Sequence, residues 1–158
     1  MKKTEKTNVM RLLDQKNIPY IMHDYTASGA VAGEDVAGVL GENPDEVFKT
    51  LVTVGKSKQY YVFLVPVCKE LNLKKAAKAV NEKSIEMIKA KELLPLTGYV
   101  HGGCSPIGMK KAFPTIIDES AKSFEKIFFS AGKIGYQVEV NVSDIEKIIR
   151  VGFSDISD

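Results

Sequence analysis

The sequence predicts an α+β fold in which helices flank a mixed, curved, barrel-like sheet within one domain covering residues 1–158. The chain has 158 residues, 44% of them hydrophobic, which is enough for one substantial core. Helix and strand patterns are mixed along it without the regular β-α-β alternation of a doubly wound fold. Several of the predicted strands are joined by short turns, which favours a largely antiparallel arrangement.

In the first half of the chain, short helices are predicted to alternate with strands. Thr4 or Thr7 can cap a first helix, whose apolar residues recur at helical spacing and which ends near Asn17. A short helix is predicted at 34–40, and Asn43-Pro44 indicates another helix start. The predicted strands are 18–25, 47–54 and 60–65, and the last two form a hairpin whose apolar character predicts central positions in the sheet.

The second half combines helices, a glycine-rich segment and further strands. Asn72 can cap a helix through Val80, and a second helix, rich in Lys and Glu, is expected at 85–94. Ser143 can cap a final short helix through Ile149. Strands are predicted at 115–118, 126–130, 136–140 and 151–153.

Composition and charge narrow the class of protein. The 22 basic and 20 acidic residues give a net charge of +2, which is much lower than the net charge typical of a dedicated nucleic-acid-binding protein. Segments 1–20 and 69–92 are rich in Lys, which permits a basic face for phosphates or, equally, solvated helix surfaces. No stretch approaches the roughly 18 apolar residues that span a membrane, and no apolar signal core follows the N-terminus. We therefore expect a cytoplasmic protein without a membrane partner.

The cysteine and histidine content argues against a metal site. Cys68 and Cys104 lie far apart, neither belongs to a Cys-x-x-Cys pair, and the chain has only two His. We expect two reduced thiols, no disulfide framework, no metal and no cofactor.

Lys49 stands within the apolar strand 47–54. Period-2 alternation places it on the same face as Val47 and Leu51. Burying an unpaired ammonium is costly, so the side chain either extends to water near the strand end or lies at the floor of a cleft that binds an anionic or carbonyl oxygen. The sequence leaves both interpretations open.

The glycine-rich segment 102–108 is the second unusual feature. Its glycines allow backbone N–H groups to approach a ligand, and Pro106 stiffens the loop. Such a loop can stabilise an oxyanion with main-chain donors, although most Gly/Pro turns are only turns. The segment lacks the Gly-Lys-Ser/Thr ending of a P-loop. A nucleophilic pair of Cys104 and His101 is disfavoured, because neighbours three apart on such a loop need not face each other. His23 and Tyr25 either line a pocket or simply end a surface strand.

Two motifs in order resemble the YbaK family of Cys-tRNA(Pro) deacylases. They are Val47-Phe48-Lys49-Thr50-Leu51-Val52 and, about fifty residues later, Gly103-Cys104-Ser105-Pro106-Ile107-Gly108. The strand into His23-Asp24-Tyr25, the hairpin ending in Phe63-Leu64-Val65-Pro66 and the later Phe129-Ser130-Ala131-Gly132-Lys133 follow in the family's order, so the resemblance covers nearly the whole chain.

This resemblance implies a trans-editing enzyme, related to the editing domain of bacterial prolyl-tRNA synthetase, that removes Cys from tRNA(Pro) and in some cases from tRNA(Cys). The family's lysine corresponds to Lys49 and its G-x-x-P loop to Gly103-Cys104-Ser105-Pro106. In the mechanism attributed to the family, the substrate's thiol attacks its own ester and a thiolactone leaves, so the enzyme is lyase-type if the thiolactone forms and a hydrolase otherwise. The loop backbone would stabilise the oxyanion, while Lys49 would position the ester or the terminal ribose and phosphate. The remaining pocket residues expected from the resemblance are Tyr25, Thr50, His101, Gly102, Ser130 and Gly132.

One departure from the family leaves the substrate open. Some members carry a bulky aromatic before the glycine corresponding to Gly33, where this chain has Val31-Ala32, so Ala-tRNA(Pro) is an alternative substrate. A non-catalytic module that binds the tRNA end or a nucleotide is the other alternative. The expected partners are aminoacyl-tRNA and, transiently, prolyl-tRNA synthetase, through the Lys-rich segment 72–94 and its residues Lys74, Lys75 and Lys78.

Overall fold

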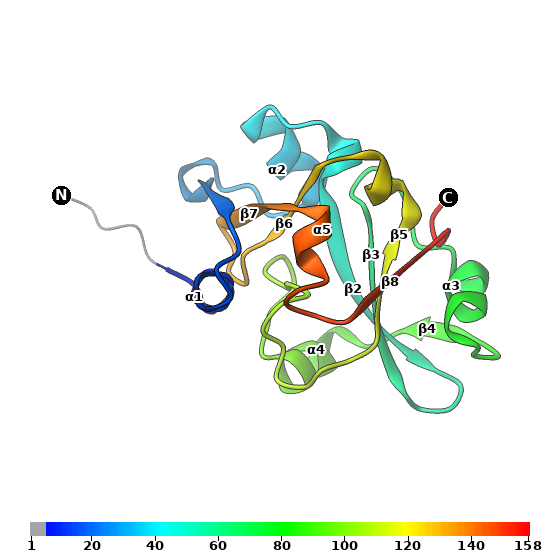
Figure 1. The fold of residues 1–158 in the computed structure, drawn as a ribbon. Coiled ribbons are helices and arrows are strands. Elements are labelled where there is room, and N and C mark those ends of the chain that lie inside the picture. Colours follow the sequence, from blue (N-terminus) through cyan, green and yellow to red (C-terminus); the bar gives the residue numbers. More distant parts are fainter. Residues whose placement is uncertain (1–5) are drawn as a thin grey trace.

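The computed structural model describes residues 6–158, which form helices packed around two sheets (Figure 1). The α-helices are α1 (Asn8–Gln15), α2 (Gly33–Leu40), α3 (Leu73–Val80), α4 (Ala90–Thr97) and α5 (Val142–Ile145), and the 3-10 helices are η1 (Thr26–Ser28), η2 (Pro44–Glu46) and η3 (Glu119–Ser123). The strands are β1 (Tyr20–Asp24), β2 (Phe48–Gly55), β3 (Tyr60–Pro66), β4 (Ile85–Met87), β5 (Thr115–Asp118), β6 (Lys126–Ser130), β7 (Tyr136–Asn141) and β8 (Val151–Ser154).

The two sheets together form a curved, open surface. One has the strand order β1-β7-β6 and is antiparallel throughout. The other has the order β4-β2-β3-β5-β8, in which β3, β5 and β8 are parallel and the remaining pairs are antiparallel. A parallel bridge between Val47 and Phe128 links the sheets at the start of β2. The predicted mixed, curved sheet is confirmed, but it does not close into a barrel.

The hairpin of β2 and β3 separates two apolar cores, as its dense apolar sequence predicts. Along β3, Val62 and Leu64 face the larger core, whereas Tyr61, Phe63 and Val65 face a smaller one beneath α3. This alternation is the period-2 geometry of a strand buried on both sides. The order of the strands confirms that β2 and β3 occupy central positions.

Two helix predictions need correction. Residues 85–94 are not one helix: Ile85–Met87 forms β4, which pairs with the end of β2, and α4 begins only at Ala90. Pairing with an existing sheet edge outweighs helix propensity there. The final helix, expected at 143–149, is the single turn α5, and the residue at its N-cap is Asn141. At the N-terminus Thr7 caps α1 through Met10 N–H, while Thr4 lies outside the described residues.

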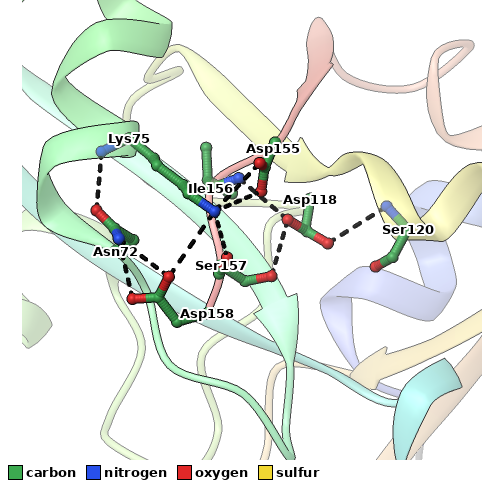
Figure 2. Close-up of polar contacts among 8 residues, drawn as sticks. All are labelled: Asn72, Lys75, Asp118, Ser120, Asp155, Ile156, Ser157 and Asp158. Atoms are coloured by element: carbon green, nitrogen blue, oxygen red, sulfur yellow. Dashed lines mark hydrogen bonds and ion pairs between the residues drawn. The ribbon is translucent and has the colours of Figure 1, made fainter.

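The C-terminal segment 155–158 is tied to α3 by Lys75 (Figure 2). The Lys75 ammonium donates to Asp155 Oδ1 and to the Ser157 carbonyl, both at 3.1 Å, and lies 3.7 Å from Asp158 Oδ1. The ammonium thus makes two hydrogen bonds and a longer ion pair to this segment. Lys75, expected as a contact for tRNA, therefore also holds the C-terminal segment.

Asp118, at the end of β5, also fixes this segment (Figure 2). Its buried Oδ1 accepts hydrogen bonds from the Ile156 N–H at 3.1 Å and the Ser157 hydroxyl at 3.0 Å. Burial alone would raise the pKa of this carboxyl, but hydrogen bonds from Ser120, Ile156 and Ser157 outweigh it and lower the pKa below its usual value. Asp118 is therefore a charged anchor of the fold.

No helix within residues 6–158 is long and apolar enough to cross a membrane.

Candidate functional site

A cavity of about 460 Å³ opens between the segment 31–36, the start of β2, the glycine-rich segment and the sheet formed by β6 and β7. Its wall brings together seven of the eleven site residues that the sequence predicts. They are Tyr25, Lys49, Thr50, His101, Gly102, Cys104 and Ser130. Val31 and Ala32, which precede Gly33, also line it. Residues far apart in the sequence thus converge on one concave site, the usual arrangement of a small-molecule pocket.

The other four predicted residues lie outside the wall of this cavity. Gly103 packs on the backbone of the segment 133–134, and Ser105 is fully buried. Pro106 lines a second cavity. Gly132 adopts φ +90°, and a Cβ there would meet Tyr99 and Val9 at 3.0 Å, so this glycine allows close packing rather than ligand contact.

Several contacts fix the backbone of the glycine-rich segment. Gly102 has φ +86°, a conformation that favours glycine, and the Gly103 N–H donates to the Val100 carbonyl at 2.9 Å. The Ser105 hydroxyl accepts the Ile107 N–H at 3.3 Å, and the Tyr99 hydroxyl donates to the Ile107 carbonyl. Within residues 6–158, the N–H groups of Cys104 and Ser105 have no hydrogen-bond acceptor. The loop therefore has a fixed backbone, and of its two unpaired N–H groups one belongs to Cys104 in the cavity wall, whereas the other belongs to the fully buried Ser105.

Lys49 is the second residue of β2, on the face opposite Phe48 and Val52, which belong to the larger core. Its side chain is 28% exposed, and its ammonium lies 3.5 Å from Oε1 of Glu70, whose side chain is 86% exposed. Such an exposed partner is weakly held and is readily exchanged for a ligand anion. Lys49 thus combines both sequence interpretations, because it reaches water from a strand end and also lines the cavity.

Cys104 is unsuited to act as a nucleophile. Burial raises the pKa of its thiol to about 12, so at neutral pH only about one thiol in 10⁵ is ionised. Its side chain packs within the larger core, while His101 is exposed. His23 does not line the cavity: its Nε2 lies 3.0 Å from Oε1 of Glu139 on the neighbouring strand. No group of three or more potential metal ligands occurs among the described residues.

Sequence reasoning missed Gln137, which also lines the cavity and is only 3% exposed. Its Nε2 donates to Oε1 of Glu42 at 3.0 Å, and burial raises the pKa of Glu42. The Gln137 amide group uses its nitrogen for this bond, so its oxygen is an acceptor without a partner. The hydroxyl oxygen of Thr50 also has no partner. A Gln within the apolar strand 136–140 was the available signal.

The chain is similar in sequence to known aminoacyl-tRNA editing proteins. A family model described as "Aminoacyl-tRNA editing domain" matches residues 27–148. The chain is 44% identical, over 99% of its length and 96% of the relative's, to the "Putative Cys-tRNA(Pro)/Cys-tRNA(Cys) deacylase EbsC" of Enterococcus faecalis. It is 28% identical over 132 residues to a proline–tRNA ligase of Fervidobacterium nodosum, matching 83% of this chain and 22% of that enzyme.

Two solved structures share the fold. A crystal structure of "hypothetical protein APE2540" superposes with a TM-score of 0.88 at 19% identity, over 96% of this chain and all of that one. A "putative trans-editing enzyme for prolyl tRNA synthetase" gives a TM-score of 0.81 at 19% identity, over 96% and 98% of the two chains. Together with the family match, these findings confirm the resemblance noted in the sequence, and the chain belongs to the family of aminoacyl-tRNA editing domains.

Proposed function

We propose that this editing domain is a trans-acting deacylase that releases cysteine from mischarged tRNA(Pro), with Cys-tRNA(Cys) as a second substrate. The relative from Enterococcus faecalis, similar over nearly the whole of both chains, carries this activity in its name. The observation that carries the proposal is the cavity wall itself, which offers a main-chain donor and a lysine, while its one cysteine is protonated at neutral pH. A reaction whose substrate supplies the nucleophile suits such a site.

In the proposed reaction the cysteinyl sulfur attacks the carbonyl carbon of its own ester. A C–S bond forms, the C–O bond to the terminal ribose breaks, and the thiol proton ends on the ribose hydroxyl. The products are a cyclic thiolactone and free tRNA. Negative charge develops on the carbonyl oxygen, and the unpaired N–H group of Cys104, a residue of the cavity wall, would stabilise it. The protein's task is then to hold the ester in a reactive geometry.

Lys49 would bind the aminoacylated end of the tRNA by its phosphate or ester oxygen. The ammonium pairs with the exposed carboxylate of Glu70 at 3.5 Å, and a phosphate can replace that carboxylate at little cost. The two unpaired acceptors, Thr50 Oγ1 and Gln137 Oε1, would bind the α-ammonium of the amino acid. The negative phosphate would thus contact a cation, and the positive α-ammonium would contact two hydrogen-bond acceptors.

The choice of amino acid depends on the size of the cavity. Val31 and Ala32 leave room in the wall, and an apolar pocket discriminates poorly between small side chains. Alanine lacks a thiol, so its release would need water as the nucleophile. We propose cysteine as the substrate and keep alanine, and a non-catalytic module that binds the tRNA end, as outcomes to test.

The proposed setting is the cytoplasm, in a transient complex with prolyl-tRNA synthetase that supplies tRNA selection. Of the three lysines of α3, Lys74 and Lys78 are the candidates for contact, because Lys75 is engaged by the C-terminal segment. Reversing their charges should weaken tRNA-dependent activity and reduce its dependence on salt. Unchanged activity and salt dependence would contradict this placement.

The test of the function is deacylation of Cys-tRNA(Pro) and Ala-tRNA(Pro), measured side by side for the wild-type protein and for Lys49→Ala. Lys56→Ala, which removes an exposed lysine outside both the cavity and the segment 72–94, is the matched control. Release of cysteine but not of alanine by the wild-type protein, together with no release of cysteine by Lys49→Ala, supports the proposal. Release of alanine at an equal rate would mean that water is a competent nucleophile. Release of neither amino acid would favour the binding module.

A further inference from the structure

A second cavity, of about 660 Å³, adjoins the same glycine-rich segment. Gly102 and Cys104 line the first cavity, whereas Pro106 and Gly108 line the second. Because Cys104 and Pro106 are only two residues apart, their Cα atoms lie within about 7 Å of each other. The ligand positions lie further apart: Lys49 in the first cavity pairs with Val65 and Phe113 in the second lies against Tyr60, so five residues of β3, about 17 Å at roughly 3.3 Å per residue, separate them. That is the length of about five nucleotides stacked at roughly 3.4 Å each, or of fewer in an extended strand.

The rim of the second cavity is positively charged. Lys111 and Arg150 line it, both are exposed, and no acidic residue does. Neither cation makes an ion pair with any of residues 6–158. Arg150 is one of only two arginines in a chain whose other basic residues are lysines. Its guanidinium suits bidentate binding of a phosphate.

The floor of the cavity is apolar and includes an aromatic ring. Phe113 is half-buried, and its ring is tilted against that of Tyr60 with centroids 5.7 Å apart, which holds it in place from one side. Met109 and Ile149 extend this apolar surface, and Gln59 adds an amide with both donors and acceptors. A cationic rim around an aromatic platform is how proteins bind single-stranded nucleic acid without strict sequence preference.

We propose that this cavity binds one nucleotide of the unpaired 3′ strand of the tRNA, with its base against Phe113 and its phosphate at Arg150 and Lys111. This inference rests on the proposed function, since it is the ester in the first cavity that brings the strand to the second. The glycine-rich segment then serves both ends of one ligand: Cys104 faces the ester, and Pro106 faces the nucleotide. Occupancy of the second cavity also holds the segment against movement during the reaction.

The kinetic test compares two substrates that carry the same ester. One is Cys-tRNA(Pro), and the other is the cysteinyl ester of adenosine, which is too short to reach the second cavity. For the variant Arg150→Gln/Lys111→Gln we expect KM for the tRNA to rise about tenfold and the salt slope to fall by about two, with kcat/KM for the adenosine ester unchanged. The matched control, Lys56→Gln/Lys122→Gln, removes two exposed charges that line neither cavity and lie outside the segment 72–94, and it should alter neither substrate.

A binding measurement separates this inference from the proposed function. Fluorescence anisotropy gives Kd for an uncharged tRNA acceptor stem with and without its unpaired 3′ nucleotides, and needs no turnover. The wild-type protein should bind the stem with the 3′ strand about tenfold more tightly, and the Arg150 and Lys111 variant should lose that preference. Phe113→Leu, which keeps an apolar side chain in the packed position, should lose part of it.

Two results would overturn the inference. One is an equal Kd for both stems in the wild-type protein, whether or not the protein deacylates. The other is that free cytidine or adenosine monophosphate changes cleavage of the adenosine ester and that this response disappears in the variant. The second result would make the cavity a site for a free nucleotide instead of the tRNA strand.

Discussion

Substituting Gly103 by Ala tests the proposed oxyanion site without touching any ionisable group. A Cβ on Gly103 would lie 3.0 Å from the Ile134 backbone nitrogen and 3.3 Å from the Lys133 carbonyl carbon. Both atoms belong to the main chain, so they cannot rotate away as a side chain would. To reach an ordinary contact of 3.4 Å, the loop has to move by about 0.4 Å. That movement carries the neighbouring Cys104 N–H with it.

The expected loss follows from the sensitivity of such donors to position. Removing one oxyanion donor costs about 10²–10³ in kcat, and a misplacement of about 1 Å can cost about 10²-fold. For a shift of about 0.4 Å we expect kcat of Gly103→Ala to fall about tenfold to a hundredfold, with KM little changed. Single-turnover release of labelled cysteine from Cys-tRNA(Pro) measures this directly.

Gly38→Ala is the matched control, because Gly38 lies within α2 with nothing within 4 Å of a Cβ built there. It should leave kcat unchanged and raise the free energy of unfolding by about 0.5–1 kcal/mol. Thermal unfolding of both variants confirms that the fold is retained. If Gly103→Ala keeps the wild-type kcat and melting temperature, the loop backbone does not stabilise the transition state.

Three further predictions concern groups whose pKa the fold shifts. Cys104→Ala should retain kcat within about threefold and lose about 1 kcal/mol of stability, because the protonated thiol only fills core space; a loss of 10³ or more would make it a nucleophile. Asp118→Asn should lose about 1–3 kcal/mol at pH 7 by urea unfolding. Since the folded pKa of Asp118 is lowered, its contribution is present above the unfolded value near 3.8 and disappears as pH falls through the folded pKa, so a constant deficit down to pH 2 would contradict it. For Glu42, burial raises the folded pKa, so its contribution is present below the unfolded value near 4.5 and is lost as pH rises through the folded pKa. As pH rises through the folded pKa, the free energy of unfolding of Glu42→Gln should therefore increase relative to that of the wild type. A variant that becomes progressively less stable than the wild type over this pH range would refute this.

Much of the fold could be predicted from local patterns. The hairpin of β2 and β3 is found because buried strands are continuous apolar runs, and α3 because Asn72 supplies a cap ahead of an amphipathic turn pattern. The strand β4 was missed because three residues rich in Glu and Met look helical, and only pairing with the edge of β2 makes them a strand.

The candidate site was predictable where backbone or charge conflicted with simple packing. Lys49 in an apolar strand and the glycines at 102–103 gave such signals. Gln137 gave a weaker one, since its importance depends on Glu42, nearly a hundred residues away, which directs its amide. The role of Lys75 could not be predicted either, because its partners lie at the far end of the chain.

The most direct test of the central claim, that the substrate's thiol is the nucleophile, is to compare Cys-tRNA(Pro) with 2-aminobutyryl-tRNA(Pro). The two side chains are nearly equal in size, but the second has a methyl group in place of the thiol, so the cavity should admit both. The account predicts that cysteine is released at least a hundredfold faster, while both substrates bind with similar Kd. Release of both amino acids at equal rates would contradict it and make water the nucleophile.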